Sequence, residues 1–268
     1  MTSPSRTVHK TTCRIVCDNG LSIGTGFLFV FRHPEQQDVF CPILVTNKHV
    51  VAGARVAIVR FNISSKQDPN LSFFDLQIEN PEGAFVMHPE ENVDLCVYPL
   101  SEFHRELKRR ELQLDATVFT DGDLNGIERL TPVEEVYMTG YPNGLWDEKN
   151  NKPITRKGIT ASDVNTDWNG SEEFMIDMAC FGGSSGSPVF IMNEGSYVVD
   201  HGIAMGTRFI LLGILYAGPQ VNVNGTVDII NVPTAAVAVA SSKIMMNLGI
   251  VIKAKKIKDF MPLLGLWN

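Results

Sequence analysis

The chain has 268 residues, of which 44% are hydrophobic and 20% charged, and its formal net charge at pH 7 is −7. This composition is typical of a soluble globular protein, and the chain is long enough to bury a full core. The negative charge argues against a nucleic-acid partner, because phosphates are neutralised by an excess of Lys and Arg. No run reaches the ~20 apolar residues of a membrane span, and the first residues lack the apolar core of a signal peptide. We therefore expect a cytoplasmic protein with no nucleic-acid or membrane partner.

The first hundred residues predict short β-strands separated by polar turns. Asp18-Asn19-Gly20 is a turn signal, and the apolar run 24–31 that follows predicts a strand. Residues 42–46 predict a buried strand that leads into Asn47-Lys48-His49. Further strands are expected over residues 54–61, 71–78 and 93–97. Many short strands at this spacing are typical of an all-β barrel or sandwich.

A charged segment with a helical stripe separates the two halves. Phe103, Leu107 and Leu114 recur at roughly helical spacing, and Ser101 is a suitable N-cap. We expect a linking helix over about residues 101–115, between an N-terminal barrel over about 10–100 and a C-terminal barrel over about 130–232.

The second half returns to β character and is expected to end in a helix. Strands are predicted over residues 134–139, 154–163, 173–179, 189–192, 208–216 and 226–232. Pro233 begins an alanine-rich stretch, Thr234 to Met246, that favours a helix ending near Gly249. The remaining tail, within 233–268, contains Lys253, Lys255, Lys256 and Lys258, which we interpret as a solvated face beside a packed one.

The cysteines indicate free thiols. Five cysteines are an odd number at irregular spacing, and the sequence has no second cysteine pair with the spacing of a metal site to complement Cys13 and Cys17. We expect reduced thiols, as in a reducing compartment, and no metal or cofactor.

The stretch around which the chemistry is expected is Phe181 to Phe190, FGGSSGSPVF. A Gly-x-Ser-Gly turn of this kind projects one serine hydroxyl, here Ser185, and directs the amides of Gly183 and Ser185 toward one point, as an oxyanion requires. The same letters fit the Gly-x-Ser-x-Gly elbow of α/β-hydrolases, in which Ser184 would be the nucleophile. That fold needs an acid and then a histidine downstream, where the one histidine is His201 and the one aspartate ahead of it is its immediate neighbour Asp200.

A serine becomes nucleophilic when a base takes its proton and an acid holds that base in one tautomer. His49 stands at the end of an apolar strand, and Asp94 stands in an otherwise apolar strand where a carboxylate is costly to bury unless it is bound. Together with Ser185 they occur in the order His, Asp, Ser.

Three motifs, residues 46–51 (TNKHVV), 94–97 (DLCV) and 177–188 (DMACFGGSSGSP), occur in that order. On these motifs the chain resembles the chymotrypsin-like (trypsin-fold) serine proteases, and most closely the HtrA-like and related bacterial trypsin-like peptidases. Residues 24–27 (GTGF) and 212–216 (LGILY) match further strands of that family, so the resemblance covers about residues 12–250.

The resemblance implies an all-β fold, a single domain of two six-stranded antiparallel β-barrels with a C-terminal helix, and an active site between the barrels. It implies His49 as general base, Asp94 as the group that orients it, and Ser185 as the nucleophile. Ala179 and Cys180 would lie at the base of the specificity pocket, with Tyr216, Ala217 and Gly218 as its wall. No carboxylate is at the base, so we expect a small or medium apolar residue before the scissile bond.

Two departures from the family bear on regulation. The trypsin subfamily has an aspartate before the nucleophile that pairs with a new N-terminus after cleavage, whereas this chain has Ser184. We therefore expect no activation by N-terminal cleavage, and control by a partner or by loop ordering. HtrA relatives append a peptide-binding PDZ domain, for which the residues after Gly249 are too few.

The resulting hypothesis is a serine endopeptidase that acts on protein or peptide substrates, as a regulated or effector protease. Two alternatives remain: a non-catalytic, protease-like module that binds a peptide, and a protease that is inactive until a partner or second messenger orders its oxyanion loop.

Overall fold

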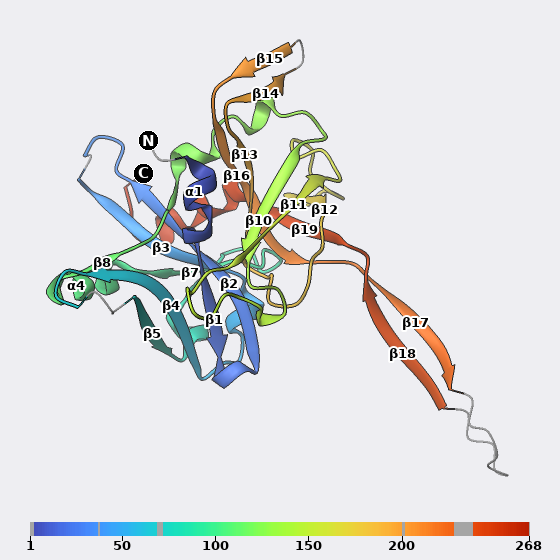
Figure 1. The fold of residues 1–268 in the computed structure, drawn as a ribbon, viewed down its shortest axis with the longest axis horizontal. Helices are drawn as coiled ribbons and strands as arrows, with labels where there is room; N and C mark the ends of the chain where they lie inside the picture. The colour runs from blue at the N-terminus through green and yellow to red at the C-terminus, as the bar shows by residue number, and fades with distance from the viewer. Residues whose placement is uncertain (1–2, 37, 69–71, 200–201, 228–237, 268) are drawn as a thin grey trace.

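The computed structural model describes residues 3–36, 38–68, 72–199, 202–227 and 238–267, without side chains for residues 220–245. Two β units lie side by side, and two β-hairpins project from the second of them (Figure 1).

The N-terminal half is one sheet of nine described strands. Their order is β5-β4-β1-β2-β3-β7-β6, with β8 paired to β4 and β9 paired in parallel to β2. The strands are β1 (Thr12–Cys17), β2 (Ser22–Arg32), β3 (Phe40–Thr46), β4 (Val56–Ser65), β5 (Phe73–Glu79), β6 (Val86–Met87), β7 (Cys96–Pro99), β8 (Leu112–Leu114) and β9 (Phe119–Thr120).

The outer strands β5 and β6 do not pair with each other among the described residues, so this sheet is a half-barrel and the predicted first closed barrel is not found. The chain leaves β5 at Asn80, which has a φ of 45°, and enters the short helix α3 (Pro81–Ala84). Because Pro81 has no N–H for a strand ladder, this connection replaces a further strand pairing with a helical turn.

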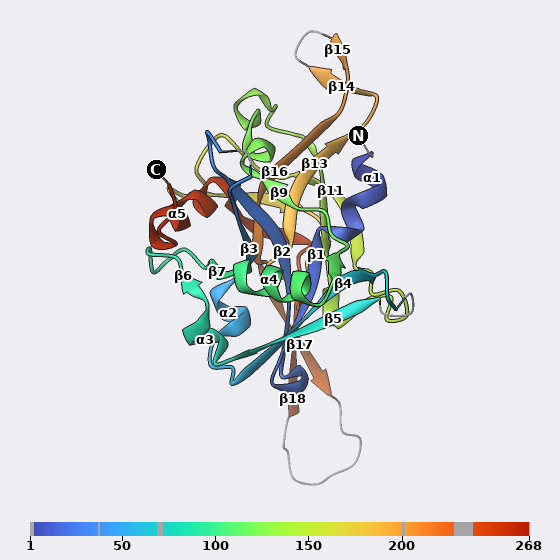
Figure 2. The same cartoon turned by 90° about the vertical axis from the view of Figure 1, so that its left-hand side faces the viewer.

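Short helices cover the half-barrel. They are α1 (Pro4–Thr7), η1 (Val8–Lys10), η2 (Asp18–Gly20), α2 (Lys48–Val51), α3 and α4 (Ser101–Arg109). Helix α4, which lies across the sheet in Figure 2, buries Phe103 and Leu107. The expected linking helix is thus present but shorter than 101–115, because Glu111 adopts a φ of 56° and the chain turns into β8. Its N-cap is Leu100 rather than Ser101.

The C-terminal half contains a closed six-stranded antiparallel barrel, as predicted. Its order is β10-β11-β12-β19-β16-β13. The strands are β10 (Glu135–Gly140), β11 (Ile154–Thr160), β12 (Glu173–Asp177), β13 (Pro188–Asn193), β16 (Arg208–Ala217) and β19 (Leu248–Lys253), and the short helices around the barrel are η3 (Asp121–Leu124), η4 (Ile127–Arg129), η5 (Pro142–Gly144), η6 (Ala254–Asp259) and α5 (Phe260–Leu263). The barrel therefore closes with a strand that lies beyond residue 232.

Two hairpins are inserted between barrel strands. Strands β14 (Ser196–Val199) and β15 (Gly202–Met205) form one, and β17 (Gln220–Val227) and β18 (Ala238–Met245) form the other. The predicted helix over Thr234–Met246 is wrong for residues 238–245, and its residues 234–237 lie outside the described residues, as does the end of the strand predicted over 226–232. The helix propensity of alanine is a weak preference that pairing with β17 overrides here.

The two halves share a hydrophobic core. Phe27 of β2, Phe119 of β9 and Phe190 of β13 are fully buried in one cluster. The ring of Phe119 contacts Phe27 edge-on at a centroid distance of 5.6 Å and stacks on Phe209 of β16 at 5.3 Å. This packing fixes the position of one half against the other.

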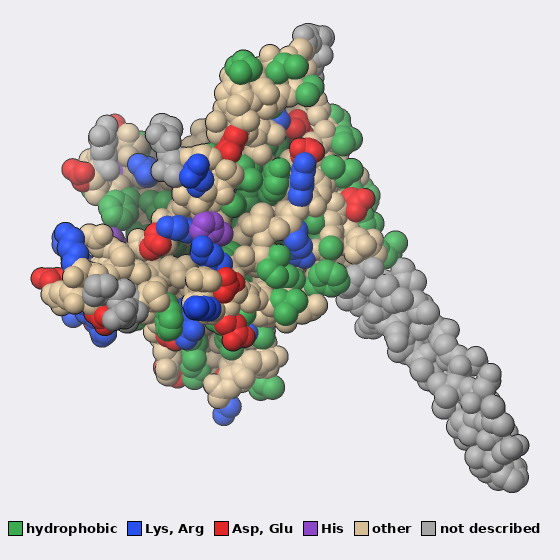
Figure 3. All heavy atoms as spheres, viewed as in Figure 1, with side chains coloured by type: hydrophobic (Ala, Val, Ile, Leu, Met, Phe, Trp, Pro, Cys, Tyr) green, Lys and Arg blue, Asp and Glu red, His purple; other side chains and the backbone are tan. Residues whose placement is uncertain are grey.

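The lysines of the tail differ in their surroundings, and the solvated-face interpretation is wrong for two of them. Lys253 and Lys256 are buried. Lys253 Nζ lies 2.6 Å from Asp167 Oδ1, and Lys256 Nζ lies 2.7 Å from Glu90 Oε1 and also pairs with Glu172. The face visible in Figure 3 carries Lys, Arg, Asp and Glu side chains interspersed over the N-terminal half.

All five cysteines are free and buried. Within the part of the chain that the structure describes, no helix combines the length and apolarity needed to cross a membrane.

Candidate active site

His49 lies on α2, directly after strand β3. Val50 and Val51 are buried and hold this turn against the sheet, whereas the His49 side chain is 48% exposed. Gly24 permits the close approach of β2, because a Cβ there would lie 2.4 Å from the Val50 side chain. His49 therefore projects outward from a rigid turn.

Asp94 stands before β7 and binds His49 through both carboxylate oxygens. Asp94 Oδ2 lies 2.5 Å from His49 Nδ1, and Oδ1 accepts a hydrogen bond of 3.1 Å from the His49 main-chain N–H. The Asn47 side chain donates to the Asp94 carbonyl over 2.7 Å. A carboxylate only accepts, so Nδ1 carries the proton and Nε2 is left as the basic nitrogen.

The two serines of the central motif point to different surroundings. Ser184 is fully buried, and its Oγ accepts a hydrogen bond of 2.7 Å from Arg156 Nη2 on β11. Ser185 is half-buried and lines a surface pocket. In the alternative α/β-hydrolase interpretation Ser184 would attack the substrate, but its side chain faces the protein interior.

The loop before Ser185 is a turn whose geometry requires glycine. Ser184 N–H donates to the Phe181 carbonyl over 3.0 Å, and Gly183 at the third position has a φ of 79°, as in a type II turn. The Gly182 carbonyl accepts a hydrogen bond of 2.5 Å from Asn143 N. Because C=O and N–H of a trans peptide point in opposite directions, the Gly183 N–H points away from Asn143. Among the described residues, neither this amide nor that of Ser185 has a hydrogen-bond acceptor.

Thr25 of β2 joins this loop to the N-terminal half. Its Oγ1 donates to the Gly183 carbonyl over 2.9 Å, and its N–H donates to the Ser185 carbonyl over 2.8 Å. Thr46, three residues before His49, donates to the Thr25 carbonyl over 2.8 Å. One strand residue therefore connects the serine loop to the turn that carries His49. The sequence motif 24–27 marked this strand but not the role of Thr25.

Ser185 and His49 are brought to this region from different halves, but they are not hydrogen-bonded here. Within the described residues, Ser185 Oγ has no hydrogen-bond partner, and neither has His49 Nε2. Such contacts are often long in unliganded enzymes and shorten when substrate binds.

The pocket beside Ser185 has a volume of about 300 Å³. It is lined by Cys180, Tyr216, Ala217 and Gly218, together with Phe181, Gly182, Ser185 and Leu215. Ala179 is not on its surface, and the Ala179 carbonyl accepts a hydrogen bond from Arg156 instead. No carboxylate lines this pocket.

Two side chains of the pocket, Cys180 and Tyr216, have raised pKa values. Burial raises the pKa of the Cys180 thiol to about 11. The pKa of Tyr216 is raised by burial, by its hydrogen bond to Glu173 and by the charge of Asp94, and its hydroxyl lies 2.8 Å from Glu173 Oε1.

Three side chains outside this site have the spacing of metal ligands, but two of them already pair with a lysine. His88, Glu90 and Asp259 offer ligand atoms within 4.8 Å of one another. The Lys256 ammonium lies 2.7 Å from Glu90 and 3.5 Å from Asp259. These contacts account for the grouping as an ion-pair network.

A family model for the trypsin-like peptidase domain matches residues 24–199. The chain therefore belongs to the trypsin-like peptidase family. No curated protein is significantly similar to it.

Solved structures similar to this chain include proteases of the HtrA type. The HtrA-type protease AlgW with a tripeptide is 16% identical with a TM-score of 0.47, covering 98% of this chain and 63% of that one. The inactive mutant form of Rv3671c from M. tuberculosis is 14% identical with a TM-score of 0.46, covering 98% and 89%. The MamO protease domain from Magnetospirillum magneticum is 13% identical with a TM-score of 0.45, covering 98% and 100%. These similarities concern the fold alone.

Proposed function

We propose that the chain is a serine endopeptidase in which Ser185, His49 and Asp94 form the catalytic triad. The observation that supports this most is the two-point contact between Asp94 and His49, with a 2.5 Å bond to Nδ1. A tautomer fixed in this way serves general-base catalysis, and peptide binding alone would not need it.

In the proposed reaction Ser185 Oγ attacks the peptide carbonyl carbon while His49 Nε2 takes the hydroxyl proton. The imidazolium that forms is stabilised by Asp94 and then gives its proton to the leaving amine, so that the C–N bond breaks and an acyl-enzyme remains. Water, deprotonated by His49, attacks the ester and releases the acid product with regeneration of Ser185.

The amides of Gly183 and Ser185 are proposed to bind the oxyanion. Neither amide has an acceptor among the described residues, and this supports the assignment together with the hydrogen bond between Asn143 N–H and the Gly182 carbonyl. One donor of this kind contributes roughly 3 kcal/mol of transition-state stabilisation, about a hundredfold in rate.

Substrate preference is proposed to follow from the neutral pocket. With Cys180, Ala217 and Gly218 on its surface and no carboxylate, it fits a small or medium apolar residue before the scissile bond. An intracellular location is proposed because five free buried cysteines suit a reducing compartment.

The missing bond between Ser185 and His49 favours one second candidate, a protease that needs a partner to complete its site. Labelling with a fluorophosphonate, read by intact mass, separates the candidates. A single adduct that is lost in Ser185→Ala but kept in Ser184→Ala supports the active enzyme. Loss only in Ser184→Ala would overturn the assignment of the nucleophile. No adduct on folded wild-type protein would favour the partner-dependent protease or the binding module.

A further inference from the structure

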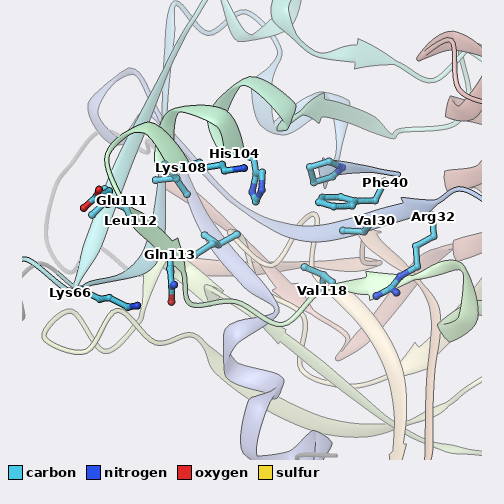
Figure 4. Close-up of a pocket in the computed structure, with 13 residues that line it drawn as sticks. Val30, Arg32, Phe40, Lys66, His104, Lys108, Glu111, Leu112, Gln113 and Val118 are labelled. Carbon is cyan, nitrogen blue, oxygen red and sulfur yellow. The ribbon is translucent and has the colours of Figure 1, made fainter. Parts of the chain in front are cut away.

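A large cavity lies outside the proposed active site, beside the interior strands β2 and β3 of the N-terminal sheet. It has a volume of about 910 Å³ and lies between the ends of β2 and β3, strand β8 and helix α4 (Figure 4). Strand β8 pairs with β4 and not with the interior strands β2 and β3, and the cavity lies between β8, helix α4 and these two strands.

The floor of the cavity is apolar. Val30, Pro42, Leu114 and Val118 contribute to it, and a narrow extension of about 30 Å³ continues inward among some of the same residues toward Phe103. Ligand sites for small molecules have this size and a mainly apolar lining. An apolar body is therefore the part of a ligand that this floor would accept.

The rim of the cavity is cationic. Arg32, Lys66 and Lys108 line it, all three are exposed, and none forms an ion pair with another described residue. Figure 4 shows Arg32 and Lys66 reaching toward the cavity from opposite ends, with Lys108 on the helix beside His104.

Acidic groups near the rim are already engaged. Glu111 is the one carboxylate among the lining residues, and it accepts a hydrogen bond from the Gln67 side chain. Asp121 accepts a hydrogen bond of 3.4 Å from the main-chain N–H of Arg32. Burial raises the pKa of the Asp123 carboxyl, and the charge of Arg32 lowers it against this larger effect, but these two groups form no ion pair. The guanidinium of Arg32 and the two ammonium groups therefore remain available to an anion.

We propose that this cavity binds a single-chain amphipathic anion, with its acyl chain on the apolar floor and its carboxylate at the cationic rim. The apolar floor matches the acyl chain, and the positive rim matches the charge of the carboxylate. The cavity is separate from the proposed active site: Val30 lies about 17 Å along β2 from Thr25 at the usual rise per residue.

Calorimetric titration of the 268-residue chain tests the proposal without any protease assay, so its result is independent of the proposed function. The probes are laurate, 1-dodecanol and dodecylammonium, each below its aggregation concentration. Laurate is expected to bind one equivalent at least about tenfold more tightly than dodecylammonium, because only the anion gains charge-assisted bonds. Equal binding of the three, or no binding of laurate, would overturn the proposal.

Variants locate the site. Arg32→Ala combined with Lys108→Ala is expected to weaken laurate binding about tenfold, whereas Lys149→Ala, an exposed lysine that does not line the cavity, should change it less than about twofold. Val118→Trp, which fills the floor, should weaken laurate and dodecanol alike, with circular dichroism confirming the fold. Unchanged binding in the folded double variant would contradict the assignment.

Vesicles separate a soluble ligand from a lipid surface. Wild-type protein is expected to bind laurate and to float no more with phosphatidylglycerol vesicles than with phosphatidylcholine vesicles. Flotation with the anionic vesicles and no binding of free laurate would overturn the cavity proposal in favour of a membrane-surface site.

Discussion

The Arg156 guanidinium donates a hydrogen bond of 2.7 Å from Nη2 to Ser184 Oγ, and Nη1 donates to the Ala179 carbonyl. The Arg156 side chain on β11 therefore contacts both Ala179 and Ser184, the residue before Ser185. Burial lowers the pKa of Arg156, and no described carboxylate pairs with it. In the trypsin subfamily that the sequence resembles, the position of Ser184 is an aspartate that pairs with a new N-terminus. Here a cation of the folded chain contacts that position instead.

Replacing Arg156 is expected to loosen the serine loop. Arg156→Ala should lower kcat/KM roughly ten- to hundredfold, since it removes two hydrogen bonds that position Ser185. Arg156→Lys should restore only part of the activity, because one ammonium cannot reproduce the two-pronged contact. The fluorophosphonate labelling rate measures the effect. Lys157→Ala, the neighbouring exposed residue, is the control, and an equal loss there would contradict a specific role for Arg156.

Asp94→Asn is expected to leave the fold intact and to lower the labelling rate of Ser185 by about 10³- to 10⁴-fold. The amide nitrogen can donate to Nδ1, which favours the tautomer with the proton on Nε2 and removes the base. Asp177→Asn, at an exposed strand end, is the matched control. Retention of most activity in Asp94→Asn would exclude Asp94 from the triad.

Gly186→Ala is expected to prevent stable folding, whereas Gly170→Ala should cost only about 1 kcal/mol. Both glycines have similar φ values, 85° and 80°. A Cβ at position 186 would lie 1.9 Å from the Thr25 carbonyl oxygen, while a Cβ at position 170 would meet no atom within 4 Å. Urea unfolding of the two variants separates the steric clash from the cost of positive φ. Equal stabilities would show that the serine loop does not pack against β2 as described.

Glu172 is expected to make stability depend on pH in the acid range. Hydrogen bonds from Lys255 and Lys256 lower its pKa from 4.5 to about 2. A carboxyl with a lower pKa in the folded state contributes stability above pH 4.5, and this contribution is lost as the pH falls toward 2. Glu172→Gln should therefore flatten the fall in unfolding free energy between these values, and Lys255→Gln should do so partly. Identical slopes for wild type and Glu172→Gln would contradict the pairing.

The sequence determined the features that depend on local pattern. Alternating apolar strands predicted the β fold, since a strand buries one face in a period of two. The order of His49, Asp94 and the serine motif in the chain predicted a catalytic triad, and each of the three stands next to a strand, His49 after β3, Asp94 before β7 and Ser185 before β13. The motif alone left two candidate nucleophiles, Ser184 and Ser185. Their positions differ only in the structure, where Ser184 is buried against Arg156.

Tertiary structure decided what depends on distant partners. Residues 238–245 form a strand because β17 lies beside them, which outweighs their weak helical preference. Lys256 is buried because Glu90 and Glu172, far away in sequence, neutralise it. Thr25 of β2 connects the two halves, and the cationic cavity lies where β8 pairs with β4 and not with β3. Both features depend on which strands pair. Pairing between distant segments is a global minimum of packing and hydrogen bonding, and no local pattern in the chain encodes it.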